Sequence, residues 1–209
     1  MSSESSRKNI FDKIRLALTK STPIPFPQIV GDEAQFHSSE KDLVLEFAEQ
    51  FTSLLGKFIF CEDVIKLPLT VNGLCKQMDW QKIYCTEEKF ANHFPQALRT
   101  DDIINCDAGI TSCELLISRT GSIVLSSNNS GRIASAYAPI HICIAYTSQV
   151  VYDIKDAFSI LQKKYGDLLP SFITLATGPS RTADIEKTLV VGVHGPKEVY
   201  LILADDLVY

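Results

Sequence analysis

The 209-residue chain lacks the marks of several common classes of protein. No apolar run approaches the roughly 18 residues that a membrane-spanning helix needs, so no membrane span is predicted. Its six cysteines include no C-x-x-C pair, which argues against a zinc or iron–sulfur site held by this chain. The polar start, Met1-Ser2-Ser3-Glu4, does not resemble a signal peptide. We therefore expect a cytoplasmic chain that binds no metal of its own.

Basic residues are also few, since 20 Lys and Arg face 25 Asp and Glu, for a net charge of −5. The longest basic clusters are the pairs Arg7-Lys8 and Lys163-Lys164, which are typical of solvated helix faces. Nucleic-acid binding normally needs a basic patch, so no nucleic-acid partner is expected. Neither a Gly-Lys-Ser/Thr phosphate loop nor a G-x-G-x-x-G after a strand is present, which argues against the standard nucleotide folds.

The cysteines that are present look like reduced core residues. Most stand inside apolar runs, such as Phe58-Ile59-Phe60-Cys61 and Ile142-Cys143-Ile144. A buried free thiol behaves as a small hydrophobic side chain.

Apolar spacing predicts helices and strands in alternation. The predicted helices cover residues 4–20, 40–56, with Gly56 as a candidate C-cap, and 153–165, which ends at Gly166. The predicted strands cover residues 57–61, 83–85, 122–126, 140–146, 172–176 and 199–204. Several strands are apolar throughout, as are strands covered on both faces. We therefore predict an α/β fold with a mainly parallel, multi-layer sheet.

Three prolines separate the N-terminal region from the rest of the chain. Pro23, Pro25 and Pro27 forbid helix and favour an extended connector. We predict an N-terminal helix and proline-rich arm over residues 1–30, and one domain over residues 31–209.

The densest group of candidate binding residues follows a predicted strand. Gly178 permits a tight turn, and Ser180 or Thr182 could cap a helix that starts near Ala183. The amide groups of such a helix start, together with the guanidinium of Arg181, suit a carboxylate or a phosphate. The alternative is a well-capped turn between a strand and a helix, with no ligand.

Two carboxylates follow in the same segment. If the segment is helical, Asp184 and Glu186 are about 200° apart and cannot both face one ligand. Asp184 is the better candidate for moving a proton. Glu186 remains a ligand-binding candidate that could instead pair with a nearby cation.

A second turn, Gly192-Val-His-Gly-Pro196, places His194 between glycines. His194 could act as a general acid or base, or donate to an anion. The alternative is a turn histidine with a backbone partner. We expect this turn to fold against the one at Gly178 and form a single pocket. His141, inside a predicted strand, looks more like a satisfied core histidine.

A third segment, Ser118-Arg119-Thr120-Gly121-Ser122, leads into the predicted strand at 122–126. Thr120 and Ser122 offer hydroxyl groups beside a flexible glycine, so all three residues are candidates for ligand binding. As a turn, the segment needs no further explanation.

These segments resemble the signatures of the LUD family, and the resemblance covers roughly residues 40–209. Thr120-Gly121-Ser122 is similar to its T-G-[ST] motif, the run from Gly178 to Glu186 to its G-P-S-x-T-A-D-I-E signature, and the run from Gly192 to Pro196 to the G-x-H-G-P that follows. Family members often carry an acidic residue where this chain has Arg119, which changes the local charge beside the T-G-[ST] motif.

The resemblance implies a fold related to the NagB/RpiA/CoA-transferase group and a role in L-lactate utilization. It implies a subunit without a redox centre, whose partners would be an iron–sulfur subunit that carries its own LUD domain and a cysteine-rich iron–sulfur subunit. Together they are associated with the oxidation of lactate to pyruvate, and the iron–sulfur clusters belong to the partners. Two alternatives stay open: a stand-alone enzyme acting on a phosphosugar or an acyl/CoA-type substrate, and a ligand-sensing module.

Overall fold

The computed structural model describes residues 3–20, 41–128, 131–185 and 188–207. The chain divides into a unit of residues 1–37 and a unit of residues 38–209, which are described separately. In the first unit, helix α1 (Ser3–Leu18) confirms the predicted N-terminal helix, and Ile10 and Ile14 are exposed on it. The predicted connector at Pro23, Pro25 and Pro27 lies outside the described residues.

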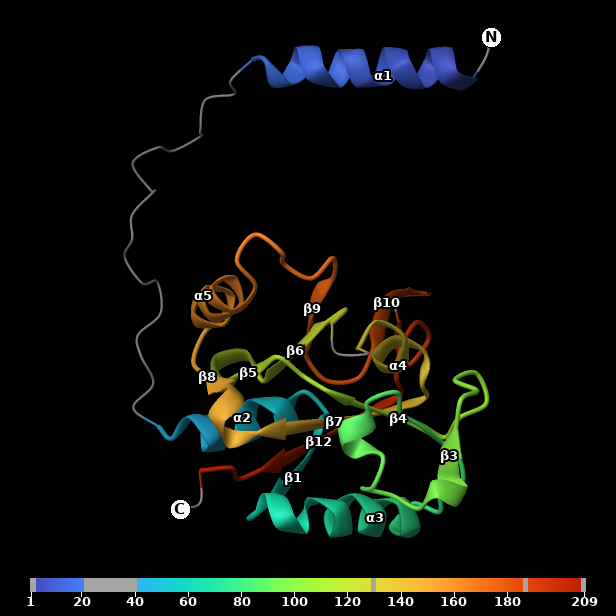
Figure 1. Ribbon diagram of the computed structural model, residues 1–209, viewed down its shortest axis with the longest axis vertical. Coiled ribbons are helices and arrows are strands. Elements are labelled where there is room, and N and C mark those ends of the chain that lie inside the picture. Colours follow the sequence, from blue (N-terminus) through green and yellow to red (C-terminus); the bar gives the residue numbers. More distant parts are fainter. Residues whose placement is uncertain (1–2, 21–40, 129–130, 186–187, 208–209) are drawn as a thin grey trace. The chain divides into compact units, whose positions relative to one another are not determined.

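A six-stranded parallel sheet forms the centre of the second unit (Figure 1). In spatial order its strands are β1 (Lys57–Cys61), β12 (Glu198–Ala204), β7 (Ile140–Tyr146), β4 (Ala108–Ser112), β2 (Ile83–Tyr84) and β3 (Arg99–Thr100). Every pair of neighbouring strands in it is parallel. The central strands β4, β7 and β12 are almost wholly buried, because both faces of the sheet are covered.

A second, mixed sheet packs on one face of the first. Its strands, in spatial order, are β8 (Val150–Val151), β5 (Leu115–Ile117), β6 (Ser122–Ser126) and β9 (Ile173–Ala176). Strand β6 runs antiparallel to both β5 and β9, whereas β8 is parallel to β5. The predicted α/β class with a multi-layer, mainly parallel sheet is therefore confirmed, with a mixed second sheet added to it.

Among the described residues of the second unit, four longer helices accompany the two sheets. They are α2 (Leu43–Ser53), α3 (Leu67–Gln77), α4 (Gly131–Tyr137) and α5 (Ile154–Tyr165). Short 3₁₀ helices lie at Val64–Lys66, Glu88–Phe90, Gln96–Leu98, Ser118–Thr120 and Thr147–Gln149. The helix predicted at 153–165 is confirmed, with Asp153 as N-cap and Gly166 as C-cap.

Alternation along the central strands produces two separate cores. Ile142 and Ile144 of β7 face α3, whereas Cys143 between them packs with Phe47 and Phe51 of α2 and with residues of the second sheet. A third, smaller core lies between the second sheet and α5. The layers are thus α3, the parallel sheet, α2 with the second sheet, and α5, in the order visible in Figure 1.

The prediction that Gly56 is the C-cap of α2 is wrong. The C-cap is Leu54, and Leu55 takes the left-handed conformation with φ of 68°. Gly56 serves packing instead, because a Cβ there would lie 2.5 Å from the ring of Phe51.

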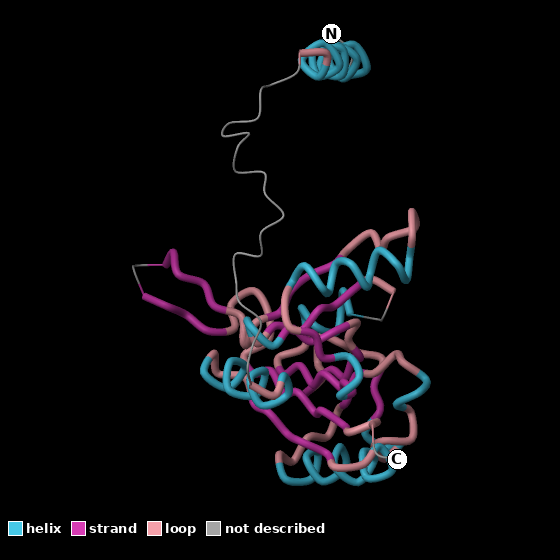
Figure 2. Tube along the Cα trace, turned by 90° about the vertical axis from the view of Figure 1, so that its left-hand side faces the viewer, coloured by secondary structure: helices cyan, strands magenta, loops and turns pink. Residues whose placement is uncertain are grey.

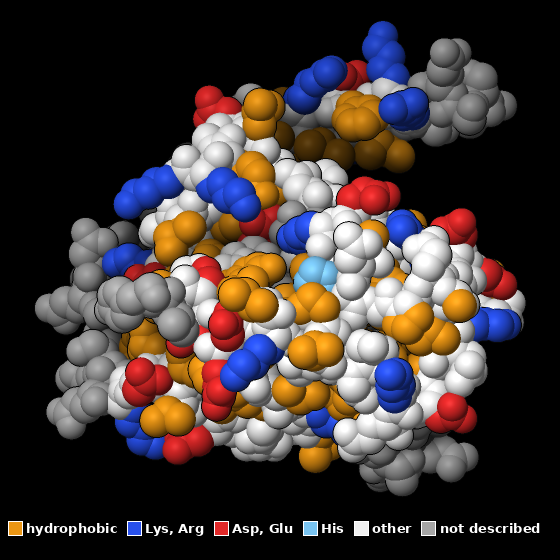
Figure 3. All heavy atoms as spheres, turned by 60° about the horizontal axis from the view of Figure 1, so that its bottom comes forward, with side chains coloured by type: hydrophobic (Ala, Val, Ile, Leu, Met, Phe, Trp, Pro, Cys, Tyr) orange, Lys and Arg blue, Asp and Glu red, His pale blue; other side chains and the backbone are white. Residues whose placement is uncertain are grey.

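The surface agrees with the near-balance of charges in the sequence. Figure 3 shows Lys, Arg, Asp and Glu side chains interspersed with hydrophobic ones over the face that it displays, rather than gathered in a basic patch. Within the described ranges, no helix combines the length and the apolar character that crossing a bilayer requires.

All six cysteines are free and buried, as the sequence predicts. Burial raises the pKa of several of these thiols, that of Cys75 to about 11, and so disfavours the reactive thiolate.

We therefore predict that a thiol reagent such as DTNB labels the native chain far more slowly than the unfolded chain, in which six equivalents react at once. Fast stoichiometric labelling of any thiol in the native chain would contradict the burial of these six side chains.

Candidate functional site

The two glycine-bearing turns of the C-terminal region lie against each other, as predicted. The amide of Ser180 donates to the carbonyl of Pro196 at 3.0 Å, and the amide of Gly192 donates to the carbonyl of Ser180 at 2.8 Å. Gly195 is in close contact, since a Cβ there would lie 2.9 Å from the Cβ of Ser180. The two turns therefore form one structural element.

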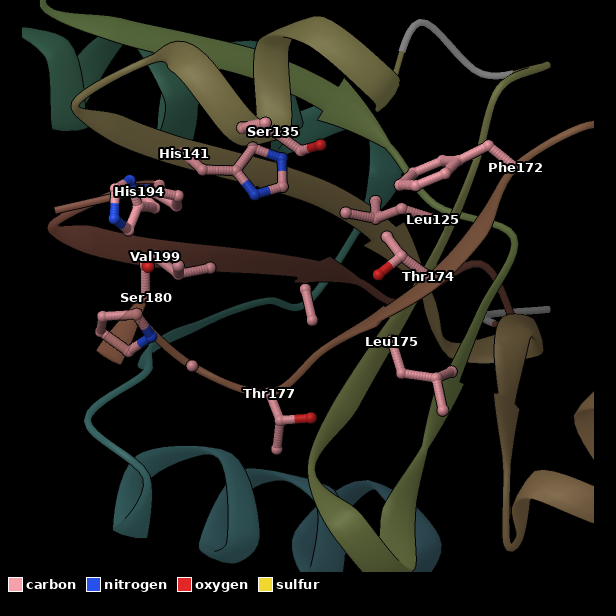
Figure 4. Close-up of a pocket in the computed structure, with 16 residues that line it drawn as sticks. Leu125, Ser135, His141, Phe172, Thr174, Leu175, Thr177, Ser180, His194 and Val199 are labelled. Atoms are coloured by element: carbon pink, nitrogen blue, oxygen red, sulfur yellow. The ribbon is translucent and has the colours of Figure 1, made fainter. Parts of the chain in front are cut away.

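A hollow of about 350 Å³ opens beside these turns (Figure 4). Its floor is formed by three buried side chains, Leu125 of β6, His141 of β7 and Val199 of β12. The hollow therefore lies at the amino ends of β7 and β12 and runs along β9 to the turn that follows its carboxyl end. Its volume falls within the range of small-molecule sites, about 300–1,000 Å³.

Of the candidate residues from the sequence, Gly178, Ser180 and His194 line this hollow. His194 is exposed at the rim. Thr177 also lines the hollow but is not among the candidates from the sequence. Its place directly after the predicted strand at 172–176 is the feature of the sequence that points to it. His141 is buried as expected, yet it lines the hollow as well.

The predicted helix near Ala183 is wrong. The segment forms strand β10 (Arg181–Ile185), which pairs antiparallel with β11 (Thr188–Val191) in a hairpin that projects from the second unit (Figure 2). The backbone of Ser180 is already hydrogen-bonded to the Gly192–Pro196 turn, so the chain enters this pairing instead of a helix. No helix start therefore lies behind Ser180 to attract an anion, and Ser180 and Thr182 cap none.

The hairpin also changes the argument about the two carboxylates, which assumed a helix. Asp184 lies in β10, where the structure describes the backbone but not the side chains of Asp184 and Thr182. Glu186 lies outside the described residues.

Arg181 does not take the expected position at the hollow. Its side chain is exposed, and its guanidinium donates to the carbonyl of Leu54 at 3.3 Å, at the end of α2. Arg181 is not among the described residues that line the hollow, so its contact anchors the turn to α2.

Two glycines let the site segments pass closely over the end of α2. Gly178 has a φ of +78°, and a Cβ there would lie 2.3 Å from the carbonyl oxygen of Leu54. Gly121 has a φ of +60°, and its Cβ would lie 2.6 Å from the amide nitrogen of Phe51. Neither position can accept a side chain without moving the backbone.

A chain of hydroxyl groups joins the Thr120-Gly121-Ser122 segment to the hollow. The Oγ atoms of Thr120 and Ser122 are 2.7 Å apart, and 2.8 Å separates the Oγ of Ser122 from the Oγ1 of Thr177. Ser122 is buried, and only Thr177 of the three lines the hollow. The segment thus positions Thr177.

Arg119 supports helix α5. Its guanidinium lies 2.8 Å from Oδ1 of Asp153, the N-cap of that helix. The hydrogen bond from Arg119 lowers the pKa of the Asp153 carboxyl.

The two histidines of the hollow differ in their environments. The Nε2 of His141 lies 2.8 Å from the Oγ1 of Thr111, deep between β7 and β4. Burial lowers the pKa of His141 to about 4, so its ring is neutral near pH 7. His194, at the rim, is open to solvent and to a ligand.

The described residues do not suit a metal or an iron–sulfur cluster. No three His, Cys, Asp or Glu side chains among them gather as a metal ion would require. The thiols are buried, and burial raises the pKa of Cys75, Cys85, Cys106 and Cys143. A cluster would need thiolates close together.

The close approach of Gly178 to α2 leads to a stability prediction. Gly178→Ala should lower the free energy of unfolding by about 2–5 kcal/mol, because left-handed strain and overpacking add. Gly73→Ala is the matched control: Gly73 lies inside α3 with nothing within 4 Å of its added Cβ, so this change should stabilise the chain by about 0.5–1 kcal/mol. Equal effects of the two substitutions in urea denaturation would contradict the described turn.

The burial of His141 leads to a pH prediction. The unfolded chain protonates this ring at its ordinary pKa of 6.5, whereas the folded chain does so only at about 4. Protons therefore favour the unfolded state, and stability falls as pH drops from 6.5 towards 4, by up to roughly 3 kcal/mol from this residue. His141→Gln, which does not titrate, should show a correspondingly shallower loss in urea denaturation across this range. Parallel curves for the two proteins would refute a buried neutral His141.

Comparison with known proteins adds family membership to this geometry. The family model of the LUD domain matches residues 45–204, a range that contains the described residues lining the hollow. The lactate utilization protein C of Bacillus licheniformis is 42% identical over 101 residues, which cover 46% of this chain and 42% of that protein. The protein of the same name from Bacillus subtilis is 40% identical over 103 residues, which cover 47% and 43%. The chain thus spans less than half the length of these curated relatives.

A solved structure shares the fold. The crystal structure of a DUF162 family protein from Deinococcus radiodurans superposes with a TM-score of 0.60 at 17% identity, and covers 78% of this chain and 96% of that one. At this identity the likeness concerns the fold alone. The sequence match over residues 45–204 carries the assignment: this chain belongs to the LUD domain family.

Proposed function

We propose that this chain is a cytoplasmic, non-redox subunit of an L-lactate utilization system. The observation that carries the proposal is its similarity, at about 40% identity, to proteins named lactate utilization protein C. In this proposal an iron–sulfur subunit with its own LUD domain and a cysteine-rich iron–sulfur subunit hold the redox centres and oxidise lactate to pyruvate. The thiols of this chain are buried, and burial raises the pKa of several of them, which supports assigning the clusters to the partners.

The hollow beside the two turns is the proposed site of an anionic ligand. His194 at its rim supplies the hydrogen-bond donor or proton carrier, and Thr177 and Ser180 supply hydroxyl groups. Gly178 lets this turn approach α2, and Arg181 ties it to Leu54. Asp184 stays a candidate proton carrier, and Thr182 and Glu186 stay candidates for ligand contact.

The Thr120-Gly121-Ser122 segment has a supporting role in this proposal. Ser122 holds the hydroxyl of Thr177 at 2.8 Å, and Gly121 admits the backbone of α2 beside it. A change in this segment should therefore disturb ligand binding by moving Thr177.

Genetic complementation in the source organism tests the proposal. A strain that lacks this chain should lose growth on L-lactate and keep growth on glucose. His194→Ala should restore lactate oxidation to about a tenth of the wild-type rate or less, the usual scale for losing a proton carrier. Lys155→Ala, an exposed change on α5, is the matched control and should restore full growth.

Affinity purification of the tagged full chain from lactate-grown cells tests the partners. We expect co-purification of subunits that carry iron–sulfur absorbance. Undiminished growth of the deletion strain on lactate, or turnover of a phosphosugar or acyl-CoA by the purified chain alone, would overturn the proposed function.

A further inference from the structure

We infer that the hollow binds a carboxylate whose apolar chain is longer than the methyl group of lactate. The inference rests on the proposed function, because it takes this hollow as the ligand site. It rests otherwise on three separate observations: the size of the hollow, the division of its polar and apolar walls, and a lysine in the hollow next to it.

The hollow is too large for lactate alone. A lactate ion has the bulk of three or four water molecules, on the order of 100 Å³. The hollow holds about 350 Å³ and stays open at its rim. A ligand that fills it needs a body several carbons longer than that of lactate.

The walls of the hollow divide by polarity (Figure 4). At one end His141, His194 and Ser180 lie together around Val199. At the other end Leu125, Phe172 and Leu175 lie together, with the hydroxyl group of Thr174 between them. A carboxylate suits the end with imidazole and hydroxyl groups, whereas an alkyl chain suits the other. A sugar phosphate would leave most of its hydroxyl groups unpaired at the apolar end, which costs binding free energy.

A second hollow, of about 500 Å³, adjoins the first. It shares Ala136, His194 and Gly195 with the first hollow, and it is also lined by Lys197. The backbone of Lys197 is held in place, since its amide donates to the carbonyl of Pro139 at 2.8 Å, and its side chain starts close to Gly192, where an added Cβ would lie 2.3 Å from its Cγ. No carboxylate of the described residues forms an ion pair with Lys197.

The position of Lys197 orients the ligand. Lys197 and His194 line the second hollow together, and His194 also belongs to the polar end of the first hollow, so the negative charge of the ligand is assigned to this end. The apolar chain then extends over Leu125 towards Phe172. The ligand class is thus a monocarboxylic acid with a medium-length alkyl chain.

Isothermal titration calorimetry of the purified full chain tests the inference with two probes, L-lactate and 2-hydroxyoctanoate. Each buried methylene is worth about 0.8 kcal/mol, so 2-hydroxyoctanoate should bind at least about tenfold more tightly. Octan-2-ol, which lacks the carboxylate, should bind more weakly than the acid.

Two pairs of variants locate the binding. Ala136→Phe should abolish binding of 2-hydroxyoctanoate, because Ala136 is exposed on α4 and lies where the two hollows meet. Ile133→Phe, also exposed on α4, is its control and should bind normally. Lys197→Met should weaken the binding of 2-hydroxyoctanoate about tenfold and leave the binding of octan-2-ol unchanged. Lys155→Met should change the binding of neither compound.

The outcomes separate this inference from the proposed function. Equal affinity for the two acids, no binding of either at millimolar concentration, or binding that Ala136→Phe leaves intact would overturn the inference. Each of these results is compatible with a chain that is still required for growth on lactate. Conversely, tight binding of the longer acid by a chain that lactate growth does not require would overturn only the proposed function.

Discussion

The position of the site depends on the C-terminal end of helix α2. Two loops from different parts of the chain cross it with no space for a side chain, one at Gly121 over the amide of Phe51 and the other at Gly178 over the carbonyl of Leu54. Arg181 adds a hydrogen bond to the same carbonyl. Because Phe51 is buried in the core between the two sheets, the packing of that core sets the position of both loops.

The hollow combines a rigid floor with an open rim. Its floor comes from three strands, and one floor residue is the buried, neutral His141 next to Thr111. Its rim comes from the turn that carries His194, which the hydrogen bonds to Ser180 hold in place. Because His141 in the floor stays neutral, the exposed imidazole of His194 can hold a ligand without placing a second charge in the interior.

Much of the fold could be predicted from the sequence, whereas the detailed form of the site could not. Strands β1, β6 and β7 have the predicted bounds, because their apolar, β-branched runs have no competing helical spacing. Strand β4 was missed, since Thr111 and Ser112 interrupt its apolar pattern, and α4 was missed because it is short and begins at a glycine. At the hairpin after Ser180 the sequence predicts a helix start, because Ser, Thr and Asp suit a helix cap as well as a turn. Only the contact with the Gly192–Pro196 turn, distant in sequence, decides between them.

The central claim is that the two turns and the floor of β7 and β12 form one ligand site. A crystal structure of the full chain soaked with 2-hydroxyoctanoate tests it most directly. The account predicts electron density for the carboxylate beside His194 and for the alkyl chain over Leu125, with both turns in place. Density for the ligand elsewhere on the molecule, or side chains that fill the hollow and leave no room for it, would contradict the account.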